Sequence, residues 1–204
     1  MAFVGMRHVV FAPIKTEIEG QAVQYDKGVV VGAAIGATIN INRNSEDLYG
    51  DDRLIESDNS MTGANIDLTV DDMSDEVAVA MLGYKKDETG NVYHEEDAAT
   101  PYGGLGYIRV RLKNGKTGYQ ANWMHKVQLS VATESSSTKG QNVSWQTVTV
   151  TGKMMGVKNN AEQKTRFRER QTFEDEAEAI AWLDGKAGIT AAAAAASEGE
   201  FADE

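Results

Sequence analysis

Strict alternation of apolar and polar residues marks the segment Ala64-Asn65-Ile66-Asp67-Leu68-Thr69-Val70. Successive side chains of a β-strand point to opposite faces, so Ile66, Leu68 and Val70 share one face. The segment predicts a half-buried strand. Acidic and capping residues follow it, then an apolar stripe with Val77 and Met81, and then Gly83, which together predict a helix of about three turns.

Further strand-like segments lie on both sides of this unit, at residues 7–11, 29–31, 38–41, 107–112, 117–123, 127–131 and 143–151. Asn114-Gly115 separates two of them and predicts a tight hairpin, because a type I′ turn needs two positive φ angles. The glycine-rich residues 102–106 are interpreted as a strand entrance. A second helix is expected at residues 172–185, capped by Thr172 and with Phe173, Ala177, Ile180 and Ala181 on one face. The fold class is therefore mainly β with flanking helices, an α+β chain.

A long polar and acidic segment interrupts the strand pattern before residue 61. It reads Asn42-Arg43-Asn44-Ser45-Glu46-Asp47-Leu48-Tyr49-Gly50-Asp51-Asp52-Arg53-Leu54-Ile55-Glu56-Ser57-Asp58-Asn59-Ser60. A hairpin needs only about 2–5 residues to reverse the chain, so the segment predicts a functional or disordered loop. Its few apolar side chains suggest an arm that contacts a partner. The acids do not match a calcium loop, because Gly50 and Glu56 miss the positions that such a loop requires.

Composition limits the functions that this chain can have. Its 204 residues carry a net charge of −11 and contain no cysteine. Phosphate affinity comes mainly from Lys and Arg, so the overall charge argues against a nucleic-acid-binding protein. The missing cysteines exclude disulfides and thiolate metal sites. We expect one domain at residues 1–188, a disordered Ala-rich acidic tail at residues 189–204, no signal peptide and no membrane span, because the most apolar stretch is too short.

No catalytic constellation is visible. His8, His94 and His125 are widely separated, and neither a metalloprotease motif nor a serine nucleophile elbow is present. A hydrolase with two carboxylates is a weak rival, since nothing places two acids at the separation that it needs. We therefore expect no enzyme, no cofactor and no metal. A carbohydrate-binding β-sandwich is the main alternative, with Trp123, Trp145 and Trp182 as stacking platforms.

The most basic stretch contains Arg109, Arg111, Lys113 and Lys116, with aromatic residues nearby. Basic and aromatic residues together can bind nucleic acid by stacking. Arg109 and Arg111, however, alternate with apolar residues on a hairpin, and a positive strand in an acidic protein can meet an acidic surface on another copy. We favour this second interpretation, with Arg109, Arg111 and Lys113 as strand contacts between subunits.

The order of several short motifs resembles that of a known family. The motifs are Phe11-Ala12-Pro13-Ile14, Ser45-Glu46-Asp47-Leu48-Tyr49-Gly50-Asp51-Asp52 with Asp58-Asn59, Ile66-Asp67-Leu68, Leu82-Gly83-Tyr84, Lys126-Val127, Thr138-Lys139-Gly140 and Trp145-Gln146-Thr147 with Gly152. Over residues 4–172, this set resembles the phi13-type major tail proteins, the tail tube proteins of long-tailed bacteriophages (siphoviruses).

This resemblance implies a β-sandwich or partly closed barrel with a helix after the central strand. It also implies a structural virion protein, made in the host bacterial cytoplasm, that self-assembles into hexameric rings. The rings stack into the tail tube that conducts DNA from the capsid to the host. The implied partners are other copies of the chain, the tape measure protein, the tail terminator and tip proteins, and genomic DNA passing through the lumen. The inter-ring docking loop then corresponds to Ser45, Glu46, Asp47, Leu48, Tyr49, Gly50, Asp51, Asp52, Arg53 and Leu54.

Overall fold

The computed structural model describes residues 2–95, 98–113, 115–133, 147–158 and 164–189. Its strands are β1 (Ala2–Thr16), β2 (Gln24–Tyr25), β3 (Val29–Val30), β4 (Ala34–Arg43), β5 (Glu46–Gly50), β6 (Arg53–Asp58), β7 (Met61–Val70), β8 (Lys85–Lys86), β9 (Val92–Tyr93), β10 (Tyr102–Lys113), β11 (Lys116–Thr133), β12 (Val148–Met155) and β13 (Arg168–Phe173). Its helices are α1 (Asp75–Leu82) and α2 (Glu176–Ala187).

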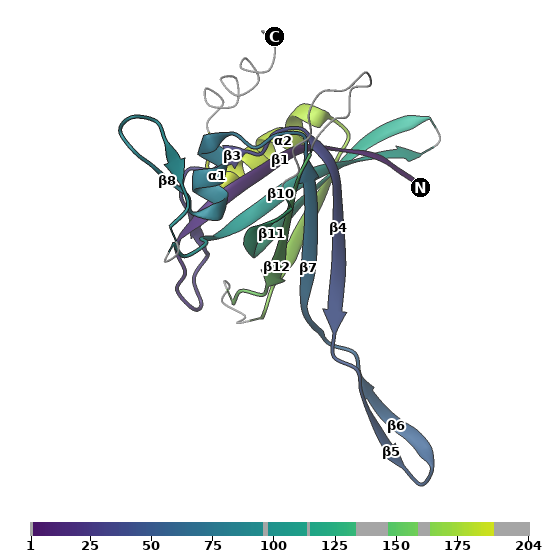
Figure 1. Ribbon diagram of the computed structural model, residues 1–204. Coiled ribbons are helices and arrows are strands. Elements are labelled where there is room, and N and C mark those ends of the chain that lie inside the picture. Colours follow the sequence, from purple (N-terminus) through teal and green to yellow (C-terminus); the bar gives the residue numbers. More distant parts are fainter. Residues whose placement is uncertain (1, 96–97, 114, 134–146, 159–163, 190–204) are drawn as a thin grey trace, which may run out of the picture.

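One large antiparallel sheet organises the chain (Figure 1). Its strand order is β2-β1-β10-β11-β12-β7-β4, and β13 and β3 pair with β11 and β1 beside this path. Among the described strands, β2 and β4 at the two ends of the order do not pair, so the sheet does not close into a barrel. The predicted β-rich α+β class is confirmed.

The segment 64–70 lies in β7 and is paired on both sides. Ile66 is opposite Ile39 of β4 and Gly152 of β12, and Gly152 is in turn opposite Leu129 of β11. Ile66 and Leu129 are almost completely buried. The face that the alternation predicted to be buried is thus the floor of the main hydrophobic core.

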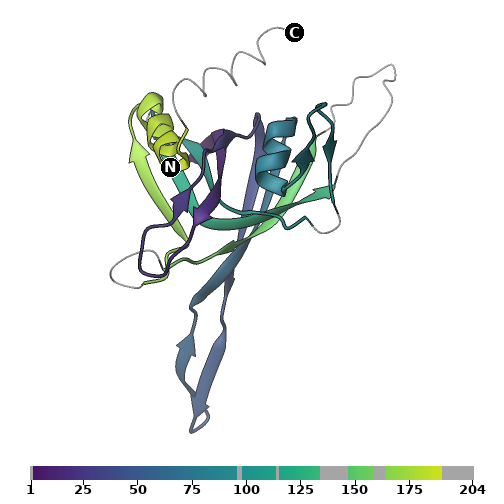
Figure 2. The same cartoon turned by 90° about the vertical axis from the view of Figure 1, so that its left-hand side faces the viewer.

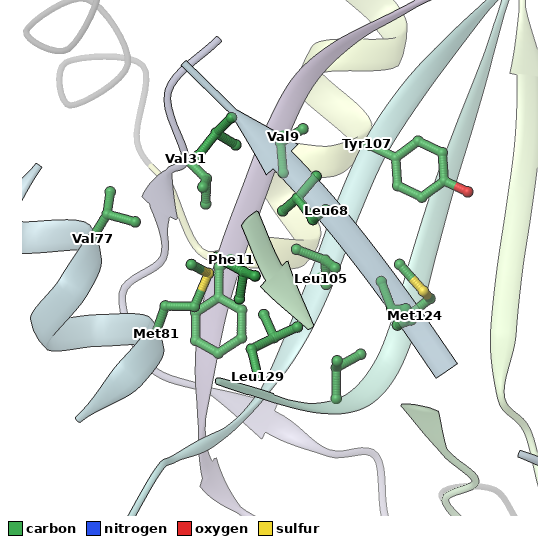
Figure 3. Packing of buried hydrophobic residues seen from close by; sticks show 14 of the residues in the cluster. Val9, Phe11, Val31, Leu68, Val77, Met81, Leu105, Tyr107, Met124 and Leu129 are labelled. Carbon is green, nitrogen blue, oxygen red and sulfur yellow. The ribbon is translucent and has the colours of Figure 1, made fainter. Parts of the chain in front are cut away.

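Helix α1 covers this core. Its N-cap is Ser74, whose side chain accepts a hydrogen bond from the Val77 N–H, and its C-cap is Gly83 at φ 79°, a conformation that favours glycine. Met81 projects from the helix toward Phe11 of β1 (Figure 3), and Val77 belongs to the same core cluster. The helix predicted after the central strand is confirmed.

Helix α2 covers the opposite face of the β1 region. Strand β1 alternates, so Val9 and Phe11 join the α1 core while Val10 and Ala12 join a second cluster with Leu183 of α2. Figure 2 shows the two helices on either side of β1. The sheet is therefore buried on both faces here, whereas its β4–β7–β12 half has a helix on one face only.

Glycines at the start of β10 allow the two clusters to pack closely. A Cβ atom at Gly103 would lie 2.2 Å from Phe11 Cζ, and one at Gly104 would lie 2.1 Å from Trp123 Cζ2. Both positions therefore need glycine, because a side chain would overlap an aromatic ring. The predicted strand entrance is confirmed, since β10 begins at Tyr102.

The predicted second helix begins and ends at the wrong residues. Thr172 lies in β13, and the N-cap is Asp175, whose carboxylate accepts a hydrogen bond from the Ala177 N–H at 2.9 Å. The C-cap is Gly188, and Gly185 lies inside the helix.

The buried face of α2 is also different from the predicted one. It consists of Ala179, Leu183, Asp184 and Ala187, whereas Ala177 and Ala181 are not part of it. The predicted helix began at Thr172, whereas α2 begins at Glu176, so the wrong apolar residues were assigned to its buried face.

Two further predictions fall partly outside the described residues. The predicted strand 143–151 is described from residue 147, and β12 continues to Met155. The predicted tail is described only at Ile189, which is buried against α2; residues 190–204 lie outside the described part.

Candidate assembly interface

The acidic segment forms a β-hairpin arm, defined here as residues 45–59. Strands β5 and β6 pair antiparallel, and Figures 1 and 2 both show the hairpin extending away from the body. The sequence predicted a loop at this place, which is wrong: most of the segment is regular strand. Of the predicted docking residues, Ser45 precedes β5, and Glu46 to Leu54 form β5, the turn and the start of β6.

The arm reverses direction at Asp51-Asp52. Both residues have positive φ angles, 51° and 59°, and the flanking Gly50 and Arg53 form the last cross-strand pair. This is the geometry of a two-residue type I′ turn, the hairpin turn whose twist matches that of paired strands. Aspartate tolerates this conformation better than most residues, so the acids serve the turn as well as the surface charge.

The apolar side chains of the arm are exposed to solvent. The exposed fractions are 57% for Leu48, 65% for Tyr49, 52% for Leu54 and 60% for Ile55. Ile55 is the extra residue at a bulge, and it packs over Gly50 of the opposite strand. An isolated two-stranded hairpin is only marginally stable in water, because it has no further strand or helix to pack against. A second surface that covers these apolar side chains would stabilise the arm.

A clasp of hydrogen bonds joins the base of the arm to the body. The Asp58 carboxylate accepts bonds from Asn44 Nδ2 at 2.8 Å and from the Ser60 N–H at 2.9 Å. These bonds lower the pKa of Asp58, the Asn44 bond most strongly. Arg43 Nη1 donates to the Asn59 carbonyl at 3.1 Å. The clasp therefore joins the two strands of the hairpin at its base.

The basic residues lie elsewhere, at a projection that we call the tip: residues 2–7 of β1, 109–113 of β10 and 116–118 of β11. Arg109 lies over the rings of Phe3 and Tyr107 at 5.2 Å and 5.4 Å, and Arg111 lies over Phe3 at 6.0 Å. Lys113 is paired with Lys116 at the end of the hairpin. In Figure 1 the tip and the arm leave the body in different directions, so one chain does not bring the two predicted surfaces together.

The sequence did not predict Phe3 as part of this surface. Its side chain is 54% exposed, and the neighbouring Val4 and Leu112 are 59% and 45% exposed. The sequence shows two consecutive apolar residues, Phe3 and Val4, close to its start. Only the pairing of β1 with β10 places them beside the basic hairpin.

The half of the sheet away from α2 carries a polar, open face. Cross-strand pairing aligns Asn40, Asn65, Lys153 and Gln128 in one row and Thr38, Asp67, Thr151 and Ser130 in the next. Most of these residues line a hollow of about 570 Å³. One lysine and one aspartate are the only charged residues in the two rows, so this face is polar but almost neutral.

The three histidines serve separate local contacts. His8 Nε2 lies 2.8 Å from Asp184 Oδ1, His94 stacks with Tyr84, and His125 Nε2 lies 3.6 Å from Glu169 Oε2. His125 is buried, and burial lowers its pKa. These are pairings between neighbouring elements, spread over the molecule.

The described residues contain no group of three or more His, Cys, Asp or Glu that could hold a metal ion. No helix within the described ranges is long and apolar enough to cross a membrane. Trp123, one of the expected sugar platforms, is completely buried, and Trp145 lies outside the described residues.

A model of the phage tail tube protein family matches residues 1–181. This span contains the whole main sheet, the arm, the tip and the first half of α2. No curated protein shows a significant match to the chain.

Proposed function

Because the chain belongs to the phage tail tube protein family, we propose that it assembles into stacked rings that form the DNA-conducting tube of a long phage tail. The family match confirms the resemblance found in the sequence, and it assigns the chain a structural role in the virion tail. Ring formation, the six-fold symmetry and the passage of DNA are the parts that we propose.

The exposed arm is the single observation that carries the proposal. It is a hairpin whose apolar side chains contact no core and whose base is held together by the Asp58 clasp. A surface of this kind is typical of a binding element that is buried only on assembly. In the proposed tube, residues 45–54 of each subunit dock onto the adjacent ring.

Open strand edges support pairing of subunits within a ring. Strand β4 pairs with β7 on one side, and its other edge is unpaired among the described strands. A ten-residue exposed edge is a hazard for aggregation unless another chain covers it. In a closed ring, one repeated contact between neighbouring subunits can pair the backbone N–H and C=O groups of every such edge. We propose this contact as the ring interface.

The polar rows of the sheet are our candidate for the surface of the lumen. They carry threonine, serine, asparagine and glutamine, with Asp67 and Lys153 as the two charges. DNA binds tightly where several cations neutralise its phosphates, and this face offers one lysine per subunit. Such a surface lets DNA pass without retaining it.

The other proposed partners follow from this role. They are the tape measure protein, the tail terminator and tip proteins, and genomic DNA passing through the lumen. The alternative, a carbohydrate-binding module, is not favoured, because Trp123 is buried among Val10, Ile108 and Leu183 and cannot stack on a sugar.

Electron microscopy of the purified full-length chain tests this proposal. We expect hollow tubes, or rings at low protein concentration, with subunits repeated around a central channel. A chain that remains monomeric at every protein and salt concentration tested, and after addition of preformed tail tips, would contradict the proposal.

A further inference from the structure

We propose that the receiving surface for the arm is the tip of another copy of the chain. This inference rests on the proposed function and adds to it the residues on which the arm docks. Charge, exposed apolar area and the direction in which the two surfaces project all support it.

The arm and the tip have opposite charge. Strands β5 and β6 and their turn contain six acidic residues and one basic residue, Arg53. Residues 109–113 and 116 of the tip contain four basic residues and no acidic one. Within the described part of the chain, no carboxylate forms an ion pair with Arg109 or Lys116, so their charge is available to a partner. Complementary charge of this kind steers association and fixes register.

Both surfaces also expose apolar side chains. The arm presents Leu48, Tyr49, Leu54 and Ile55, and the tip presents Phe3, Val4 and Leu112. Phe3 is opposite Arg111 in the β1–β10 register, and both arginines lie against its ring. The tip is therefore an aromatic surface bordered by cations, which suits an acidic hairpin that carries Tyr49.

The tip has an open strand edge as well. β3 pairs with β1 at Val10 and Phe11, and β2 pairs at Ile14 and Thr16. The Val9 carbonyl accepts a hydrogen bond from the Val31 N–H, and in the described structure no strand pairs with this edge of β1 over residues 2–7. The backbone groups of this part of the edge can therefore accept a strand from another chain. Addition of a strand to a free edge is a common way in which an extended segment is bound.

Geometry makes this contact intermolecular. The arm and the tip leave the body in different directions (Figure 1), so an arm meets the tip of a different copy. A contact between two different surfaces is heterologous, and repeated heterologous contacts give an open-ended stack. One arm–tip contact per subunit thus provides a repeating link along a tube.

Cross-linking between two single-cysteine chains tests this contact directly. The wild-type sequence has no cysteine, so Tyr49→Cys and Lys116→Cys each introduce one thiol. Mixed at equal concentration and treated with a short bismaleimide, the two variants should form a heterodimeric product. Ile18→Cys, at an exposed apolar position between β1 and β2, is the matched control and should give little product with Tyr49→Cys. Equal yields with Lys116→Cys and Ile18→Cys would overturn the inference.

Charge exchange separates this inference from the proposed function. The double change Lys113→Glu with Lys116→Glu, or Asp47→Lys with Glu56→Lys, should raise the concentration needed for assembly by about tenfold or more. Mixing the two reversed chains should restore assembly between them. If the wild type forms tubes and both reversed variants form them at the same protein concentration, the arm–tip contact is refuted and the proposed function remains intact. If the wild type forms no tubes, the cross-linking yield alone decides whether arm and tip meet.

The same tip variant also tests the alternative that the tip binds nucleic acid. Basic and aromatic residues could bind DNA by stacking and charge. Retention of duplex DNA by the wild-type chain, lost in Lys113→Glu with Lys116→Glu, would assign the tip to nucleic acid and overturn the inference.

Discussion

Trp123 and Gly104 show how single residues determine the packing of the β1–β10–β11 region. The indole of Trp123 is fully buried and crosses the backbone at Gly104, where a Cβ atom would overlap it. Tyr25 packs edge-on against the same indole, with ring centroids 5.2 Å apart. The ring has no room to move away, so the site accepts no side chain at position 104.

We therefore predict opposite effects for two glycine substitutions. Gly104→Ala should reduce the free energy of unfolding by about 1–3 kcal/mol, because a methyl group would be forced into a packed core. Gly185→Ala should leave it unchanged or raise it by up to about 1 kcal/mol, since Gly185 lies inside α2 with open space where a Cβ atom would be added. Urea denaturation of both variants checks this. Equal effects of the two changes would contradict the packing described here.

His125 makes stability depend on pH. Burial lowers its pKa below the ordinary value of about 6.5, with a smaller opposing effect of Glu169, whose other oxygen is held by Lys186 at 2.6 Å. The unfolded chain then binds a proton more readily than the folded one. The contribution of His125 to the free energy of unfolding is fully present above pH 6.5, the pKa of the unfolded chain. It is lost as the pH falls from there through the lower pKa of the folded chain.

We expect His125→Gln to reduce this pH dependence. The comparison is the free energy of unfolding at pH 7.5 and at pH 5.5 in the wild type and in the variant. The decrease on acidification should be smaller in the variant, because the other two histidines are present in both chains. An unchanged or larger decrease would show that His125 is not the group responsible.

At the scale of elements, the arm is a separate hairpin with its own turn chemistry. We predict that Asp52→Val will open the arm without destabilising the body. A β-branched residue at φ 59° costs about 1–2 kcal/mol, and the strands of the arm contact chiefly each other. Amide hydrogen exchange in residues 46–58 should accelerate about tenfold, while the unfolding temperature stays the same.

Asp52→Gly is the matched control for that variant. Glycine accepts the positive φ angle without cost, so exchange in the arm should remain at the wild-type rate or become slower. If the valine and glycine variants exchange equally, the turn does not determine the structure of the arm.

Elements with strong local signals could be predicted from the sequence. The alternation of Ile66, Leu68 and Val70 predicted β7, and the capping residues and Gly83 around the apolar stripe predicted α1. Asn114-Gly115 predicted the β10–β11 hairpin. In each of these, the local pattern and the tertiary environment favour the same structure.

Elements that depend on partners far away in the sequence could not be predicted. β13 has the sequence Arg168-Glu169-Arg170-Gln171-Thr172-Phe173, which has almost no apolar alternation; it is a strand because it pairs with β11. The arm was missed as a hairpin because Asp-Asp is a weaker type I′ signal than Asn-Gly. The candidate interface was predicted as two separate sets of residues, and Phe3 became part of it only through its β10 register.

At the scale of the whole molecule, an open sheet carries three surfaces whose apolar side chains or backbone groups have no partner within the described part of one chain. These are the arm, the tip and the free edge of β4. A monomeric globular protein seldom leaves so many apolar or unpaired groups exposed. The arrangement is explained if the functional unit is an assembly, and the arm is the element that joins one layer of that assembly to the next.

Replacement of the arm tests this central claim most directly. The Asn44 N–H donates to the Ser60 carbonyl at 2.8 Å, so residues 45–59 can be replaced by Asn-Gly to close a two-residue turn at the base. The body should keep its unfolding temperature, because the arm buries none of the core. Electron microscopy of this variant beside the wild type should show monomers or single rings and no tubes. Tubes of wild-type length would contradict the account.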